Sequence, residues 1–189
     1  MKRGAEVPDC PDVDAAGLVA CARFIPSPNF DERPAGTAID LVVIHNISLP
    51  PGQFGGDAVI DLFLNRLDPA AHPYFAGIAQ MRVSAHFLIR RDGDLIQFVP
   101  CGQRAWHAGV SNWRGRERCN DFSIGIELEG TDELPFAEAQ YERLSALVHA
   151  LMQRYPIAEL TGHSDIAPGR KTDPGPHFEW RRMHALLAS

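Results

Sequence analysis

The chain has 189 residues, of which 45% are hydrophobic and 22% are charged, an ordinary composition for a globular protein. This length favours a single domain. The formal net charge of -6 excludes the strongly basic surface that supplies most of the affinity for nucleic acids. No stretch approaches the roughly 20 apolar residues that cross a bilayer, so we expect neither a nucleic acid nor a membrane as a partner.

The N-terminus lacks the pattern of an export signal. Lys2 and Arg3 are followed by prolines and acidic residues rather than by an apolar run, and a signal peptide requires such a run. We therefore expect a cytoplasmic protein. The cysteines are scattered without a C-x-x-C pair, which favours reduced thiols over two disulfides. They are Cys10, Cys21, Cys101 and Cys119.

The first third of the chain predicts one clear strand. Residues 1 to about 37 show little periodicity, and we expect them to be irregular. The continuous apolar run within Ile39–His45 predicts a strand that is buried on both faces. His45 is expected where this strand opens into a loop, because a Pro50-Pro51-Gly52 breaker follows shortly after. A helix is expected over about 58–66.

A hairpin is predicted next along the chain. Residues 82–90 and 94–99 have the composition of strands, and Asp92-Gly93 between them is a strong signal for a tight turn. A long loop rich in glycine, asparagine and arginine is expected over about 101–120.

The last third predicts a strand over 122–128 and the longest helix over 136–154, where apolar residues recur at helical spacing. A short strand before His163 and a helix over about 178–187 complete the chain. The elements interleave without a clean β-α-β repeat. We therefore expect a single α/β domain with a central mixed sheet flanked by helices, rather than a doubly wound parallel sheet.

Two histidines and one aspartate are candidate metal ligands. His45 ends a hydrophobic strand, His163 follows a short apolar segment, and Asp173 lies ten residues later in a Pro- and Gly-rich loop. Imidazoles with one carboxylate are the usual ligands of a hydrolytic zinc site. The spacing alone does not establish the site, because a single histidine is more often a satisfied polar or surface residue than a ligand.

Two glutamates and a lysine are candidate catalytic residues. Glu127 and Glu129 leave the same face of the strand predicted over 122–128, because side chains alternate along a strand. A carboxylate in this position suits a general base, although a pair of solvated acids at a strand end would give the same pattern. Lys171 is either a surface lysine or a group that stabilises an oxyanion.

Several long motifs together resemble one family, the cytoplasmic 1,6-anhydro-N-acetylmuramyl-L-alanine amidases of bacterial wall recycling. These belong to a wider group that includes phage lysozyme-type amidases and peptidoglycan recognition proteins. The resemblance covers nearly the whole chain from about residue 22 onward, and the motifs occur in the family's order. They are Val43–Gly52, Ser84–His86, Arg90–Gly93, Ala105–Val110, Phe122–Gly130 and Gly162–Pro176.

The resemblance implies one zinc ion per chain, held by His45, His163 and Asp173. It also implies that Glu127 is the catalytic proton acceptor and that Lys171 stabilises the transition state. The expected reaction is hydrolysis of the amide bond between (1,6-anhydro-)N-acetylmuramic acid and L-alanine in muropeptides. We expect a monomer with an irregular arm over 1–21 and a zinc amidase domain over 22–189.

Four further residues are candidates for substrate binding. Trp106 and His107 are expected to line the groove, with Trp106 offering a flat apolar face, although a structural role fits Trp106 equally well. Arg82 is expected to pair with a peptide carboxylate. Asn46 is a candidate for contact with the peptide or a turn residue. His86 is expected to pack or hydrogen-bond within a strand and not to bind metal.

Two other functions remain as alternatives. Some relatives bind peptidoglycan without cleaving it, but they lack a ligand or a catalytic residue, and this chain keeps all five. An amidase that acts on polymeric cell wall would perform the same chemistry outside the cytoplasm, and the missing signal peptide argues against it.

Overall fold

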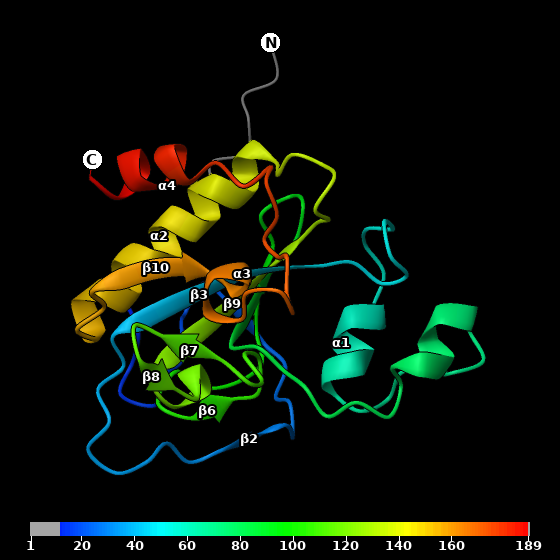
Figure 1. The fold of residues 1–189 in the computed structure, drawn as a ribbon, viewed down its shortest axis with the longest axis horizontal. Helices are drawn as coiled ribbons and strands as arrows, with labels where there is room; N and C mark the ends of the chain where they lie inside the picture. The colour runs from blue at the N-terminus through cyan, green and yellow to red at the C-terminus, as the bar shows by residue number, and fades with distance from the viewer. Residues whose placement is uncertain (1–11, 189) are drawn as a thin grey trace.

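A six-stranded sheet forms the centre of the protein in the computed structural model, which describes residues 12–188 (Figure 1). The strand order is β1-β5-β4-β9-β3-β10. β4 and β5 pair in antiparallel fashion, and the other neighbouring strands pair in parallel. The mixed sheet is therefore confirmed. The strands are β1 (Arg23–Phe24), β3 (Leu41–Ile47), β4 (Phe87–Ile89), β5 (Leu95–Gln97), β9 (Ser123–Glu129) and β10 (Glu159–Gly162).

Helices lie on both sides of this sheet. The long α2 runs along one face with α4 beside it, and α1 stands on the other side together with the turns that follow it (Figure 1). The helices are α1 (Ala58–Phe63), α2 (Glu138–Arg154), α3 (His163–Ile166) and α4 (Trp180–Leu187), with the short 3-10 helices η1 (Pro73–Gly77) and η2 (Cys119–Asp121). Four two-residue strands form two small ribbons: β2 (Phe30–Asp31) with β6 (Arg104–Ala105), and β7 (Asn112–Trp113) with β8 (Arg116–Glu117).

Most predicted elements are present, with shifted ends. The turn at Asp92-Gly93 is confirmed: Gly93 has a φ of 85° and its N–H donates to the carbonyl of Arg90. The first long strand continues to Ile47, so the prediction that His45 is its last residue is wrong. Pairing with β9 causes this difference, since it extends to Ile47 opposite Glu129.

Other differences concern short elements. The strand predicted over 82–90 is reduced to β4, because the N–H groups of Ser84 and His86 donate to Trp106 and Gly125. Short strands occupy parts of the segments that we expected to be irregular. Residues 12–21 also pack against the domain, since Val13 and Val19 are buried in its core.

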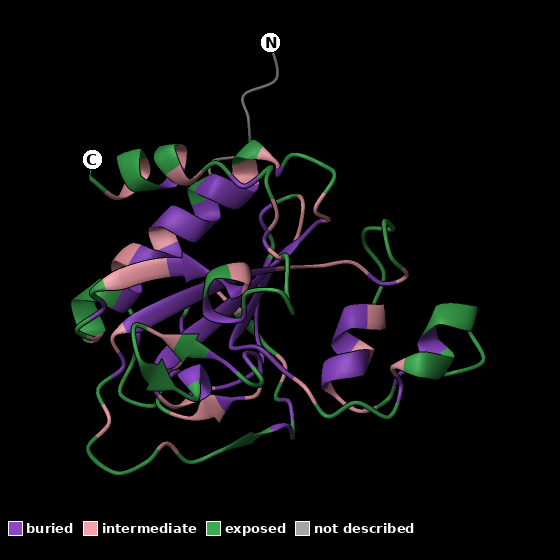
Figure 2. Ribbon diagram, in the orientation of Figure 1, coloured by how far each residue is buried: buried purple, intermediate pink, exposed green. Residues whose placement is uncertain are grey.

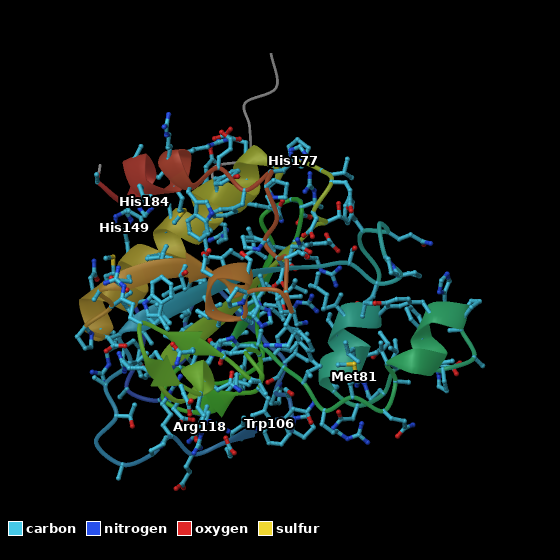
Figure 3. The ribbon with its side chains drawn as sticks, viewed as in Figure 1. Met81, Trp106, Arg118, His149, His177 and His184 are labelled. Carbon is cyan, nitrogen blue, oxygen red and sulfur yellow. The ribbon has the colours of Figure 1, made fainter. Side chains whose placement is uncertain are left out.

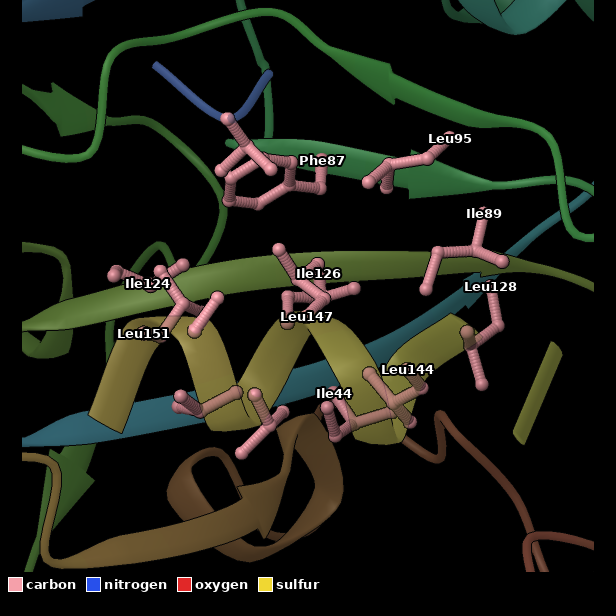
Figure 4. Close-up of a cluster of buried hydrophobic side chains, with 14 of the residues drawn as sticks. Ile44, Phe87, Ile89, Leu95, Ile124, Ile126, Leu128, Leu144, Leu147 and Leu151 are labelled. Carbon is pink, nitrogen blue, oxygen red and sulfur yellow. The ribbon is translucent and has the colours of Figure 1, made fainter. Parts of the chain in front are cut away.

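The face of the sheet toward α2 is purely apolar where the long strands cross it. Ile44 of β3 and Ile124 and Ile126 of β9 pack against Leu144 and Leu147 of α2 (Figure 4). Figure 2 shows the same region as continuously buried. Burial of large aliphatic side chains at this density makes this layer the main source of stability.

The opposite face carries two smaller apolar clusters with polar residues between them. Leu88 of β4 packs with α1 and Phe75 of η1, and Leu41 and Val43 of β3 pack with Phe122 and Ile166. Because side chains alternate along a strand, His45 leaves β3 on the same face as Leu41 and Val43. His45 and Glu127, which lies opposite it on β9, therefore point away from α2.

Cys101 and Cys119 are buried free thiols, as predicted. The prediction of reduced thiols is wrong for Cys21, which is disulfide-bonded, and Cys10 lies outside the described residues. Within residues 12–188, no helix combines the length and apolar character needed to cross a membrane.

Candidate metal centre and catalytic site

An open cavity of about 690 Å³ lies on the face of the sheet opposite α2. Eight of the ten candidate metal-ligand, catalytic and substrate-binding residues line it: His45, Asn46, Trp106, His107, Glu127, His163, Lys171 and Asp173. Arg82 and Glu129 are not part of this lining. Arg82 is exposed, and its Nη1 donates to the carbonyls of Gln80 and Met81.

Strand pairing brings the first two site residues together. His45 on β3 lies directly opposite Glu127 on β9 in the parallel register. Both side chains are almost completely buried, with exposed fractions of 1% for His45 and 9% for Glu127. The centre of the sheet therefore fixes their relative position.

The other two metal-ligand candidates come from the loop beyond β10. His163 is the first residue of α3, immediately after the strand ends. Asp173 is held beside it because the Ser164 N–H donates to the Asp173 carbonyl at 2.9 Å. Gly162 permits this close return, since a Cβ atom there would lie 2.8 Å from Cδ of Pro174.

His45, His163 and Asp173 present three atoms to one another at equal distances. Nδ1 of His45, Nδ1 of His163 and Oδ2 of Asp173 are 3.0 Å apart in each pair. The three residues form the one group with metal-binding geometry among residues 12–188. The structure thus brings together the ligands that the resemblance implied.

The protonation of the three groups fits a cation. Nε2 of His163 is 3.1 Å from the carbonyl oxygen of Ala108, which can only accept a proton, so a neutral His163 directs an unprotonated Nδ1 toward Asp173. Burial lowers the pKa of His45 to about 4, which favours the neutral form of this ring. Burial acts to raise the pKa of Asp173, but the neighbouring His163 and His45 lower it below its usual value, so the carboxyl is ionised. The lone pairs of the two Nδ1 atoms and of Oδ2 thus point toward one another at 3.0 Å, an arrangement that suits a divalent metal ion.

Glu127 lies beside the three metal-ligand candidates, and one oxygen of its buried carboxyl makes no hydrogen bond to the described residues. Its Oε2 is buried and has no hydrogen-bond partner among the described residues. Burial, together with the charge of Asp173, raises the pKa of Glu127 well above its usual value, and the charge of Lys171 opposes this effect. A carboxyl with a raised pKa binds a proton more readily, as a general base requires.

Glu129 has a different environment although it follows two residues later on β9. Its carboxylate accepts the N–H groups of Gly55 and Arg91, at 2.7 and 3.1 Å. It also lies 3.5 Å from the guanidinium of Arg90. Glu129 therefore anchors the chain before α1 and does not line the cavity.

Lys171 is exposed at the rim of the cavity, two residues before Asp173. Within residues 12–188 its ammonium group forms no ion pair. Its neighbour Arg170 is engaged, because one nitrogen donates to the carbonyls of Ala108 and Val110 at 2.7 Å each. Lys171 is thus the cation that remains available to a ligand at this rim.

The candidate substrate contacts differ in how far they are already engaged. Asn46 lies within β3, so the alternative that it is a turn residue is wrong, and its amide donates to Asp132 and to the carbonyl of Pro174. Trp106, labelled in Figure 3, is half-buried. Its Nε1 donates to Asp31, and it is one of the residues that line the cavity. His107 lies behind His45, with its Nδ1 2.9 Å from Nε2 of His45.

Sequence reasoning missed one wall of the cavity. Leu62 and Phe63 of α1 form it together with Tyr74, Ile78 and Met81 from the η1 region. Tyr74 and Met81 are each 47% exposed. The available signal was the presence of large apolar residues between the helix expected over 58–66 and the strand expected over 82–90.

The remaining histidines lie outside the group of ligands. His86 is fully buried and its Nδ1 accepts the N–H of Gly125, as expected of a residue that packs or hydrogen-bonds within the sheet. Figure 3 places His149, His177 and His184 around α2 and α4, away from the cavity.

Comparisons with known proteins agree with this geometry. The family model described as N-acetylmuramoyl-L-alanine amidase matches residues 35–176. The 1,6-anhydro-N-acetylmuramyl-L-alanine amidase AmpD of Citrobacter freundii is 61% identical over 173 residues, which are 90% of this chain and 92% of that protein.

Solved structures show the same relationship. A crystal structure of a selenomethionine AmpD derivative matches with a TM-score of 0.89 and 61% identity, over 91% of this chain and 97% of that one. The amidase AmiD from E. coli, solved in complex with the substrate anhydro-N-acetylmuramic acid-L-Ala-D-gamma-Glu-L-Lys, matches with a TM-score of 0.58 and 31% identity. That match covers 84% of this chain and 65% of the AmiD chain. On the family match and the identity to AmpD, the chain belongs to the N-acetylmuramoyl-L-alanine amidase family.

Proposed function

We propose that this protein hydrolyses the amide bond between 1,6-anhydro-N-acetylmuramic acid and L-alanine in muropeptides, with a zinc ion held by His45, His163 and Asp173. The observation that carries the proposal is the set of three ligand atoms 3.0 Å apart, with the buried Glu127 carboxyl beside His45. The identity to AmpD and the named substrate of AmiD support the choice of substrate.

Zinc is the metal that this donor set suits best. Two neutral imidazoles and one carboxylate favour zinc over magnesium or calcium, which prefer oxygen ligands. When bound, zinc supplies a Lewis acid that polarises the scissile carbonyl and lowers the pKa of a water molecule. We propose one zinc ion per chain.

Glu127 moves the proton in the proposed reaction. Its carboxylate takes a proton from water as the water oxygen attacks the carbonyl carbon. It then delivers that proton to the alanine nitrogen as the C–N bond breaks. The products are a muramic acid carboxylate and a peptide with a free amine. General acid–base catalysis of this kind is typically worth about 10²–10⁴-fold.

Lys171 stabilises the negative charge in this proposal. The carbonyl oxygen becomes an oxyanion in the tetrahedral intermediate, and an ammonium group without another ion pair is well placed to meet it from the rim. Support comes from its exposure at the cavity beside Asp173.

The cavity offers different surfaces to the sugar and the peptide. The ring of Trp106 provides a flat apolar face that suits a sugar. Arg82 stands outside the lining, and we propose that it pairs with a carboxylate of the peptide beyond the cavity. Asn46 and His107 already have protein partners, so we propose them as supports of the site rather than as primary contacts.

We further propose that the protein acts as a monomer on free muropeptides in the cytoplasm, as part of wall recycling, with residues 22–189 as the amidase domain. The identity to AmpD over 90% of this chain and 92% of that protein supports this proposal.

One assay tests the proposed function. Protein purified without added metal is analysed for zinc, then incubated with anhydro-muropeptide or with intact sacculi, and the products are read by mass spectrometry. We expect about one zinc per chain and cleavage of the soluble fragment between muramic acid and L-alanine. Less than a tenth of an equivalent of zinc, with no activity restored by zinc, would refute the metal site. Binding without cleavage would support a recognition module instead.

A further inference from the structure

His107 belongs to a chain of buried hydrogen bonds that starts at a backbone carbonyl and ends at His45. The hydroxyl of Ser123 donates to the carbonyl of Cys119 at 2.6 Å. Nε2 of His107 lies 3.2 Å from Oγ of Ser123, and Nδ1 of His107 lies 2.9 Å from Nε2 of His45. Ser123 is completely buried and His107 is 9% exposed, so water does not compete freely for these contacts.

The carbonyl of Cys119 determines which atom donates in each of these hydrogen bonds. A carbonyl oxygen only accepts, so the single proton of the Ser123 hydroxyl is committed to Cys119. Ser123 can then only accept from His107, which places the His107 proton on Nε2. A neutral imidazole carries one N–H, so Nδ1 of His107 accepts from Nε2 of His45. Nδ1 of His45 is left without a proton, facing His163 and Asp173.

The surrounding residues fix His107 in this position. Oδ1 of Asn120 accepts the N–H groups of both His107 and Ala108, at 3.1 and 2.8 Å. The ring lies against Gly125 of β9, where a Cβ atom would be 2.4 Å from Cγ of His107. The hydrogen-bond partners of the buried His107 ring among the described residues are His45 and Ser123, neither of which is a carboxylate that would stabilise a charged imidazole.

Ala108, the residue after His107, orients the second histidine, His163. The carbonyl of Ala108 accepts from Nε2 of His163 at 3.1 Å, which leaves Nδ1 of His163 unprotonated. Two consecutive residues thus orient both imidazoles, one through a side chain and one through the backbone.

We propose that His107 is a positioning residue that, together with Ser123, holds His45 in the Nε2–H tautomer and presents its unprotonated Nδ1 to the metal. This role rests on the proposed zinc site. It replaces the sequence-based expectation that His107 contacts substrate. Partners of this kind, behind a metal ligand, typically change metal affinity or activity by about 10–100-fold.

Two substitutions of His107 separate this role from simple packing. His107→Phe keeps an aromatic ring against Gly125 and removes the acceptor for His45. His107→Asn keeps an acceptor, since its Oδ1 can occupy the place of Nδ1. Zinc affinity is measured by competition with a chromophoric chelator. We expect His107→Phe to weaken zinc binding by about 10–100-fold and His107→Asn to recover most of that loss.

His86→Phe is the matched control, because His86 is also a buried imidazole beside β9 but does not reach His45. Its Nδ1 accepts from Gly125 and its Nε2 lies 3.1 Å from the carbonyl of Gln103. We expect this variant to lose stability and keep the wild-type zinc affinity. An equal loss of affinity in His86→Phe, or wild-type affinity in His107→Phe, would overturn the proposal.

The tautomer can also be observed directly. Two-bond ¹H–¹⁵N correlation spectra of the metal-free wild-type protein should show His45 and His107 both protonated on Nε2. Protonation of His45 on Nδ1 would overturn the proposal. This measurement needs no metal, so it tests the role of His107 independently of the zinc site. Wild-type protein that failed to bind zinc would refute the zinc site alone. A raised KM in His107→Phe with unchanged zinc affinity would return His107 to substrate binding.

Discussion

The two faces of β3 and β9 are built from the same strands and differ completely in chemistry. Toward α2, the strands present Val42, Ile44, Ile124 and Ile126, all fully buried in one apolar layer. Toward the cavity, the neighbouring positions include His45 and Glu127. Alternation along a strand therefore separates the residues that stabilise the fold from those that perform chemistry.

The cavity face is equally well buried, but its polar groups are satisfied by one another. Ser123, His107 and His45 are linked through hydrogen bonds, and Gly125 leaves the space that the His107 ring occupies. Oε2 of Glu127 is an exception among the described residues, because it has no hydrogen-bond partner. A buried polar atom without a hydrogen-bond partner lowers the stability of the fold. The position of Glu127 is therefore destabilising, although the proposed reaction needs a proton acceptor there.

Glu127→Gln should produce the largest effect on turnover while leaving the fold and the metal in place. The amide has the shape of the carboxyl but cannot take a proton from water. We expect kcat to fall by about 10²–10⁴-fold, with bound zinc and the midpoint of unfolding unchanged. Steady-state kinetics with an anhydro-muropeptide and elemental analysis provide the test. A variant that kept more than a tenth of the wild-type rate would show that Glu127 is not the base.

Lys171→Met tests the rim of the cavity rather than its buried face. The variant keeps the aliphatic stem and removes the charge. If the ammonium group meets the oxyanion, kcat and kcat/KM should fall together by about 10²–10³-fold with KM nearly unchanged. A pure rise in KM would instead show that Lys171 binds the peptide, and no change in either parameter would make it an ordinary surface lysine.

The buried histidines on the cavity side should make stability depend on pH. Burial, followed by the charge of Arg33, lowers the pKa of His86 to about 3 from an ordinary value of 6.5. As the pH falls below 6.5, His86 binds a proton in the unfolded state but stays neutral in the folded state. The free energy of unfolding therefore decreases between pH 6.5 and about 3. The slope should reach about 1.4 kcal/mol per pH unit for this group.

Urea unfolding of metal-free protein at several pH values measures that slope. His86→Asn is the comparison, because its Oδ1 can still accept the N–H of Gly125 but does not titrate. The variant should show a shallower slope, and an unchanged slope would mean that His86 does not contribute.

Ile126→Val changes the residue next to Glu127 on the opposite face of β9. Removing one buried methylene group should cost about 0.5–1.5 kcal/mol of stability, while kcat stays within about twofold of wild type. Urea unfolding and the same kinetic assay distinguish these effects. A large loss of activity without loss of stability would contradict the separation of the two faces.

Local patterns predicted the strands and helices well, since apolar runs and helical spacing depend on neighbouring residues. They could not predict that β3 and β9 pair with His45 opposite Glu127, because the two segments are far apart in the sequence. The end of β3 was misplaced for the same reason: the pairing with β9 extends the strand to Ile47.

The metal-ligand candidates were reached through resemblance rather than spacing. His45 and His163 are 118 positions apart, and no local rule connects such residues. The contact between His107 and His45 could not be predicted, because it depends on the path of a long loop. Gly125 carried a usable signal, since a glycine inside an apolar strand often marks a close approach of another group.

Anomalous diffraction at the zinc edge from crystals of the zinc-loaded protein tests the central claim most directly. We predict one zinc peak, bonded to Nδ1 of His45, Nδ1 of His163 and Oδ2 of Asp173 at about 2.0–2.2 Å. A peak bonded through Nε2 of either histidine, a peak elsewhere in the molecule, or no peak in protein that remains active would contradict the account.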